Sequence, residues 1–223
     1  MTNYTSSTLS KIRASDGAPL GTFPSGVTSP LAMVFDGANL WVIGETDPTK
    51  SVSKIRPSDG AILAILDTGT SPAQMVFDGA NVWVTDQSDH TVTKIRVSDN
   101  VIVGTYSVSS AFGLAFDGTN MWVGNNLGST LTKIRASDGV ILGTFTVGRM
   151  PGYLASDGAT VWSTFFIRAG KPPSNVVTML RTKNGARAGS LTVGTSTSEI
   201  YYDGTNFWVG DDATASVSKF TKN

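Results

Sequence analysis

The side chains best suited to chemistry occupy positions where the internal repeats of this sequence differ from one another. Four of them are carboxylates, namely Glu45, Asp86, Glu199 and Asp211. Two carboxyl groups about 5–9.5 Å apart, one with a raised pKa, can cleave a glycosidic bond. Small polar residues surround these four, whereas a catalytic acid needs apolar surroundings. We therefore assign no catalytic residue and keep a carboxylate-dependent hydrolase or lyase as an alternative.

Amide and aromatic side chains occupy the same positions in other copies of the repeat. The first variable position lies four residues before each repeat's aspartate and holds Ala32, Gln74, Gly113, Tyr153 and Glu199. Two further variable positions lie three and four residues after each tryptophan and hold the pairs Gly44-Glu45, Asp86-Gln87, Asn125-Asn126, Phe165-Phe166 and Asp211-Asp212. Acids, amides and aromatics at one end of a rigid scaffold can hydrogen-bond a sugar or hold a hard cation. The predicted ligand-binding residues are Gln74, Tyr153, Glu199, Glu45, Asp86, Asn125, Asp211, Phe165 and Phe166. The alternative is a rim without a ligand, where polar residues have accumulated by drift.

Two of the loops that contain these variable positions are unusual. The stretch from Phe165 to Ser174 is longer than its counterparts and combines three apolar residues with two basic ones and a Pro pair. This stretch either contacts a partner or extends the preceding strand and folds back over its own repeat. In the second loop, Asp86, Asp89 and His90 form a cluster without a defined metal geometry, so no metal site is assigned; Ca²⁺ is kept only as a candidate cofactor.

A unit of about forty residues positions these loops. It begins with Phe35-Asp36-Gly37-Ala38-Asn39-Leu40-Trp41-Val42 and returns with aspartates at 78, 117, 157 and 203. Alternation and turn residues divide the first complete unit into four strands, at about 31–35, 40–43, 51–56 and 61–66. Asp-Gly pairs such as Asp16-Gly17 join the last two strands and predict two-residue type I′ turns. Four-stranded antiparallel units in a radial array predict an all-β fold, a β-propeller.

The strand count predicts five blades in a single domain, 1–223. The expected repeats are 30–71, 72–110, 111–149 and 150–195, and a closing blade combines 196–223 with 1–29. Both termini offer a third strand for that blade. We expect the N-terminal hairpin to occupy it, and residues beyond about Ala215 to be loose or packed outside the ring. Six blades with one incomplete would leave an unpaired edge, which proteins usually avoid.

Other repeated residues are assigned to the fold. Each unit carries one tryptophan (Trp41, Trp83, Trp122, Trp162, Trp208), and we expect all five to be buried between blades. A lysine and an arginine also recur, as in Lys54 and Arg56, and we expect both to form a solvated ring paired with turn aspartates.

The pattern Phe-Asp-Gly-x-Asn-x-Trp-Val, followed by Val-x-Lys-Ile-Arg-x-Ser-Asp-Gly and Leu-Gly-Thr-Phe-x-Val-Gly, resembles the bacterial YVTN/YncE-like and streptogramin-lyase-like propeller repeats. This resemblance implies the fold and says little about function. The lyase branch is a seven-bladed enzyme that uses histidines, a glutamate and Mg²⁺. This chain has one histidine, His90, and two glutamates, Glu45 and Glu199, so the lyase site does not carry over.

The amino-acid composition limits the classes of partner that we expect. Seventeen basic and seventeen acidic residues give a net charge of zero, which argues against nucleic acid and anionic membranes as partners. There is no cysteine, and the N-terminus does not resemble a signal peptide, although the Ser/Thr/Gly-rich composition is typical of extracellular modules. The leading hypothesis is a non-enzymatic binding module for a glycan or protein; a structural repeat protein without ligand is the second. A monomer or a strand-swapped dimer fits the expected closure.

Overall fold

The computed structural model describes residues 1–45, 51–165 and 175–221. The regular structure in these residues is entirely β, with strands arranged in six antiparallel sheets. Each sheet is one blade of a β-propeller. Contacts divide the chain into two compact units, Met1–Ser107 and Val108–Asn223, and each unit holds three blades. No helix in the described ranges is long and apolar enough to cross a membrane.

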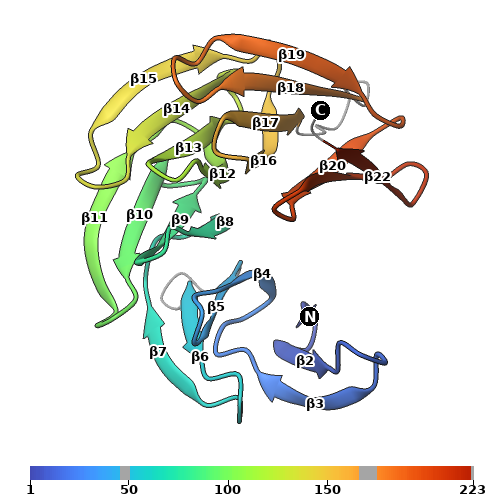
Figure 1. Ribbon diagram of the computed structural model, residues 1–223. Helices are drawn as coiled ribbons and strands as arrows, with labels where there is room; N and C mark the ends of the chain where they lie inside the picture. The colour runs from blue at the N-terminus through green and yellow to red at the C-terminus, as the bar shows by residue number, and fades with distance from the viewer. Residues whose placement is uncertain (46–50, 166–174, 222–223) are drawn as a thin grey trace. The chain divides into compact units, whose positions relative to one another are not determined.

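The first unit contains blades 1 to 3 (Figure 1). Blade 1 has three strands: β1 (Thr2–Asn3), β2 (Thr8–Ile12) and β3 (Pro19–Pro24). Blade 2 has four: β4 (Pro30–Phe35), β5 (Leu40–Gly44), β6 (Val52–Ile55) and β7 (Ile62–Leu66). Blade 3 has β8 (Pro72–Phe77), β9 (Asn81–Asp86), β10 (Thr91–Arg96) and β11 (Val101–Ser107). The strand positions predicted from alternation are confirmed to within a few residues.

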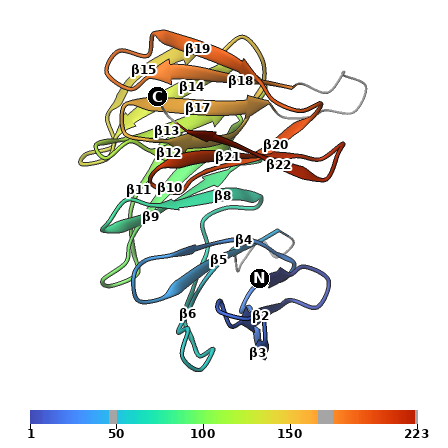
Figure 2. The same cartoon turned by 45° about the vertical axis from the view of Figure 1, so that its right-hand side comes forward.

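The second unit contains blades 4 to 6, which Figure 2 shows from another side. Blade 4 comprises β12 (Ala111–Phe116), β13 (Asn120–Asn125), β14 (Thr130–Arg135) and β15 (Ile141–Thr146). Blade 5 comprises β16 (Pro151–Ser156), β17 (Thr160–Phe165), β18 (Val176–Arg181) and β19 (Arg187–Thr192). Blade 6 has three strands, β20 (Thr197–Tyr202), β21 (Asn206–Asp211) and β22 (Ser216–Thr221).

The predicted five blades, with both termini in one sheet, are therefore wrong. The N-terminal strand β1 pairs with β2 (Thr2 opposite Leu9), on the edge where a strand from the C-terminus was expected. Residues after Ala215 are not loose, because β22 pairs with β21 from Ser216 to Thr221. Each terminal segment pairs with its neighbour in sequence, which closes a shorter loop than joining the chain ends.

The Asp-Gly-x-Asn-x-Trp motif forms the turn between the first two strands of a blade. In blade 2, Asp36 Oδ1 accepts the backbone N–H groups of Ala38 and Asn39 at 2.8 and 2.6 Å. Its Oδ2 accepts the indole N–H of Trp41 at 2.7 Å. Blades 3, 4 and 6 repeat this arrangement. One carboxylate thus shapes the turn and also orients the tryptophan.

Most of these tryptophans are buried in the cores, as predicted. Trp41, Trp83 and Trp122 are fully buried and Trp162 nearly so. Trp41 packs in a cluster with Met75 and Val82 of the next blade. Trp208 is the exception: it is half-buried, in a blade that lacks a fourth strand.

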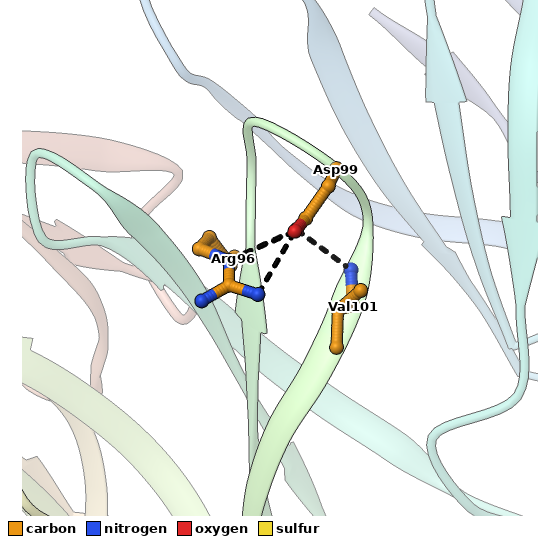
Figure 3. A network of polar contacts seen from close by, with 3 residues as sticks. All are labelled: Arg96, Asp99 and Val101. Carbon is orange, nitrogen blue, oxygen red and sulfur yellow. Dashed lines mark hydrogen bonds and ion pairs between the residues drawn. The ribbon is translucent and has the colours of Figure 1, made fainter.

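The hairpins between the third and fourth strands contain the predicted Arg–Asp pairs. Figure 3 shows Asp99 accepting hydrogen bonds from the Arg96 guanidinium and from the backbone N–H of Val101. The Arg96 guanidinium holds the pKa of Asp99 below its usual value. The type I′ expectation is wrong, since only the second residue of the pair has positive φ, as at Asn100 (φ 63°), and Asn100 N–H bonds to Arg96 O. A longer loop built around one left-handed residue replaces the two-residue turn.

The expected solvated ring of lysines is wrong, because only Lys11 and Lys219 of the five repeated lysines are exposed. Lys54, Lys94 and Lys133 are buried, and each ammonium lies about 5 Å from the centroid of its blade's tryptophan ring. Lys54 Nζ donates to Val97 O at 2.6 Å and Lys133 Nζ to Thr182 O at 2.6 Å, in each case in the following blade. Lys54 and Lys133 thus each connect two neighbouring blades by a charge-assisted hydrogen bond, and the ammonium also lies over an aromatic face.

Candidate ligand site

In the second unit two predicted site residues lie on strands that contact each other, Tyr153 on β16 and Glu199 on β20. Burial raises the pKa of Tyr153 above its ordinary value, and the negative charges of Glu199 and Asp212 raise it further. The phenol therefore lies within electrostatic reach of both carboxylates. Glu199 and Asp212 are exposed, whereas Tyr153 is half-buried.

An aromatic neighbour and a close strand contact hold Tyr153 in place. The ring of Phe112 on β12 meets it edge-on, with centroids 5.4 Å apart and an interplanar angle of 73°. A Cβ at Gly113 would collide with the carbonyl oxygen of Gly152, so β12 can approach β16 closely because Gly113 has no side chain. The backbone N–H of Tyr153 donates to Thr164 Oγ1 at 3.1 Å. We call Phe112, Tyr153, Glu199 and Asp212 the aromatic–acidic cluster.

Two members of this cluster were not among the residues predicted from sequence. Asp212 belongs to the variable position that also holds Glu45, but the preceding aspartate was chosen instead. Phe112 stands one residue before Gly113, at a position occupied by Leu31, Ala73, Gly152 and Ser198 in the other repeats. Phe112 is the aromatic residue of that series, and this difference between the repeats could have identified it from the sequence.

In the first unit, the predicted residues Glu45 and Gln74 lie in different blades. Glu45 follows β5 and is exposed, and the Tyr4 hydroxyl donates to its Oε2 at 2.7 Å. That hydrogen bond is the main reason why the pKa of Tyr4 is raised. Gln74 is half-buried on β8, and its backbone N–H donates to Thr85 Oγ1 at 3.0 Å.

Asp86 and Asp211 are buried inside their own loops. Asp86 Oδ2 accepts Ser71 N–H at 2.7 Å, and its Oδ1 accepts Asp89 N–H at 2.7 Å. Asp211 accepts the backbone N–H groups of Thr195, Thr214 and others, and these bonds lower its pKa to about 2. Such fully bonded carboxylates order the loops that surround them.

The remaining predicted residues are also buried or lie outside the described ranges. Asn125 is buried and bonds to Thr130 and Thr132 of the next strand. Phe165 is buried at the end of β17, and Phe166 lies outside the described residues. Within the described part of the chain, no group of three or more His, Asp or Glu side chains is placed to hold a metal ion.

Comparisons with known proteins agree on the fold. No protein-family model matches the chain, and no curated protein matches it. Among solved structures, a protein of unknown function from Desulfotomaculum acetoxidans DSM 771 is 16% identical with a TM-score of 0.78, covering 99% of this chain and 77% of its own. A streptogramin B lyase is 15% identical with a TM-score of 0.73, covering 97% and 73%. The computationally designed Ika8 protein is 13% identical with a TM-score of 0.76, covering 98% and 66%.

At this level of identity the likeness concerns architecture alone, and one of the three matches is a designed chain. The chain therefore has a β-propeller fold like that of streptogramin B lyase.

Proposed function

We propose that this protein is a non-enzymatic binding module whose ligand is a glycan and whose binding site is the aromatic–acidic cluster. The observation that carries the proposal is that the half-buried Tyr153 lies on a strand neighbouring that of Glu199, within electrostatic reach of the exposed carboxylates of Glu199 and Asp212. Aromatic rings cover the apolar face of a sugar, and carboxylate oxygens accept hydrogen bonds from its hydroxyl groups. The YVTN/YncE-like and streptogramin-lyase-like repeat pattern supplies the scaffold in this proposal and none of the lyase chemistry.

The loop carboxylates support binding over catalysis. Asp86 and Asp211 already accept hydrogen bonds from backbone N–H groups, so in this proposal each orders a loop and does not contact the ligand. A glycosidase would need a second, opposed carboxyl group in apolar surroundings. Glu199 and Asp212 are exposed instead, a setting suited to recognition.

A glycan array with the purified protein, with and without Ca²⁺, tests the proposal. We expect a restricted set of saccharides to bind, and E199Q to reduce that binding at least tenfold, about the loss of one hydrogen bond to a charged group. Because Glu199 is exposed, this substitution should leave the melting temperature nearly unchanged. Tyr153→Ala should also abolish binding, measured well below its own melting temperature.

Tyr201→Ala is the matched control, because Tyr201 is an exposed tyrosine on the same strand as Glu199. It should bind like the wild type. An array without any signal would favour the purely structural alternative. Binding that survives both E199Q and Tyr153→Ala would show that the ligand, glycan or protein, binds elsewhere.

A second copy of the chain is the proposed macromolecular partner. In the described residues, β22 is the last strand of blade 6 and pairs only with β21. A one-sided strand can pair with another molecule. Light scattering after size exclusion should detect a concentration-dependent dimer; a monomer at all concentrations would refute this partner.

A further inference from the structure

Two blades enclose a carboxylate within the loop that enters their first strand. In blade 3, a Cβ at Gly69 would collide with Asp86, which accepts the N–H of Ser71. In blade 6, a Cβ at Gly194 would collide with Asp211, which accepts the N–H groups of Thr195 and Ser196. Both glycines have positive φ (131° and 55°). The two loops therefore wrap around an internal anion, as backbone N–H groups in such turns commonly do.

Blade 5 has the same loop without the anion. Gly148 again has positive φ (87°), but a Cβ there would meet nothing within 4 Å. The strand register explains the missing carboxylate: Phe165 faces Pro151 at the position where Asp86 faces Pro72 and Asp211 faces Thr197. In the described part of the chain, the backbone N–H groups of Arg149 and Met150 have no acceptor.

The cation next to this loop is also specific to blade 5. Arg149 stands where blades 3 and 6 have Thr70 and Thr195, whose hydroxyl groups bond to Asp89 and Asp211. Arg149 and Arg187 line one cavity of about 210 Å³ together with Gly148, Phe165 and Thr178. Within the described ranges neither guanidinium has an ion pair or hydrogen-bond partner.

The positive charge of the whole blade is not balanced internally. In blades 1 to 4 the hairpin arginine pairs with an aspartate three residues later. In blade 5 Asn184 replaces that aspartate, and the Arg181 guanidinium donates to the Arg187 carbonyl at 3.4 Å instead. The described residues from 147 to 195 include four basic side chains (Arg149, Arg181, Lys183, Arg187) and one acidic side chain, Asp157.

We propose that the cavity of blade 5 binds an external oxyanion, a phosphate or sulfate group, in the place that an aspartate takes in blades 3 and 6. The Arg149 guanidinium and the N–H groups of Arg149 and Met150 would hold it, with Arg187 as the second cation. Guanidinium groups match the geometry of tetrahedral oxyanions and bind them strongly. This site shares no residue with the aromatic–acidic cluster and does not depend on the glycan proposal.

Titration with inorganic phosphate and, separately, with sulfate at constant ionic strength tests the site. We expect saturable binding by calorimetry, with the backbone amide resonances of Arg149 and Met150 shifting in an ¹H–¹⁵N spectrum. Arg149→Thr, which restores the residue type of blades 3 and 6, should weaken binding about tenfold. Phe165→Asp, which restores the internal carboxylate, should eliminate it. Arg135→Gln changes an arginine already paired with Asp138 and should bind like the wild type.

Several outcomes would overturn the proposal. They are a salt effect without saturation, binding that Arg149→Thr leaves unchanged, or resonance shifts confined to residues outside 147–150. If Phe165→Asp does not fold, Arg149→Thr and the resonance shifts decide the question. A preference for phosphate or for sulfate identifies the ligand as phosphorylated or sulfated, and either preference supports the site. E199Q should leave phosphate binding unchanged, so failure of the glycan proposal is distinguishable from failure of this one.

Discussion

Trp122 offers the most direct test of how the repeat stabilises the protein. Its side chain is fully buried in a cluster that joins blades 4 and 5, and its indole N–H donates to Asp117 Oδ2 at 2.8 Å. Phe145 packs on the ring, with centroids 5.4 Å apart, and Lys133 lies over it. Truncating a large buried aromatic costs about 3–5 kcal/mol. We expect Trp122→Ala to fall at the upper end, because it also removes a hydrogen bond to a carboxylate.

Trp122→Phe separates the two contributions. It retains an aromatic ring in the core but removes the indole N–H, and a hydrogen bond to a charged group contributes about 1.5–3 kcal/mol. For a chain of this length, each kcal/mol lowers the melting temperature by roughly 2–4 °C. We therefore expect decreases of about 10–20 °C for Trp122→Ala and about 3–12 °C for Trp122→Phe. Urea unfolding followed by far-UV circular dichroism gives the corresponding free energies.

Trp208→Ala is the matched control from the same repeat position. Trp208 is half-buried in a three-stranded blade, although its indole also donates to an aspartate, Asp203, at 2.7 Å. Its loss should cost less than half as much as that of Trp122. Equal costs for the two tryptophans, or a Trp122→Phe variant as stable as the wild type, would refute this explanation of the repeat.

Three further perturbations have defined outcomes. Lys133→Gln should cost about 1.5–3 kcal/mol in urea unfolding, because Lys133 is buried and donates to Thr182 O, whereas Lys219→Gln, at an exposed position, should cost little. The pKa of Asp211 is lowered to about 2, so its stabilising effect is complete above the unfolded pKa near 4 and is lost as pH falls toward 2. Asp211→Asn should therefore make the urea midpoint less dependent on pH over that range. A decrease of the midpoint as steep as in the wild type would contradict this. Arg96→Gln breaks the exposed pair of Figure 3 and should leave the urea midpoint nearly unchanged, because exposed ion pairs contribute little to stability. A clear decrease of the midpoint would mean that these pairs stabilise the hairpins.

Much of the fold could be predicted from the sequence because its determinants are local. The turn at Asp36 depends on residues within five positions along the chain, and strand alternation needs only the period of two. The burial of Trp41 followed from its recurrence in every unit. For the same reason the repeat predicted the strands of blades 2 to 5 and the Arg–Asp pairs in the hairpins of blades 2 to 4.

The number of blades and the roles of several polar residues depended on contacts distant in sequence. Both termini offer a third strand, and only the pairing of β1 with β2 and of β22 with β21 shows that each end forms its own sheet. Lys54 looks solvated as a repeated lysine, yet it is buried because its ammonium reaches a carbonyl 43 residues away.

The candidate site followed the same division. Tyr153 and Glu199 were chosen because their repeats disagree, but their proximity, and the addition of Phe112 and Asp212, came from the packing of β12, β16 and β20. Asp86 and Asp211 have the residue type of a ligand site, and their burial among backbone donors depends on how two loops meet. Residue type and spacing determined which side chains could act, whereas contacts across the sheets decided which of them are free to do so, because burial and hydrogen bonding are properties of neighbours that the chain brings together only on folding.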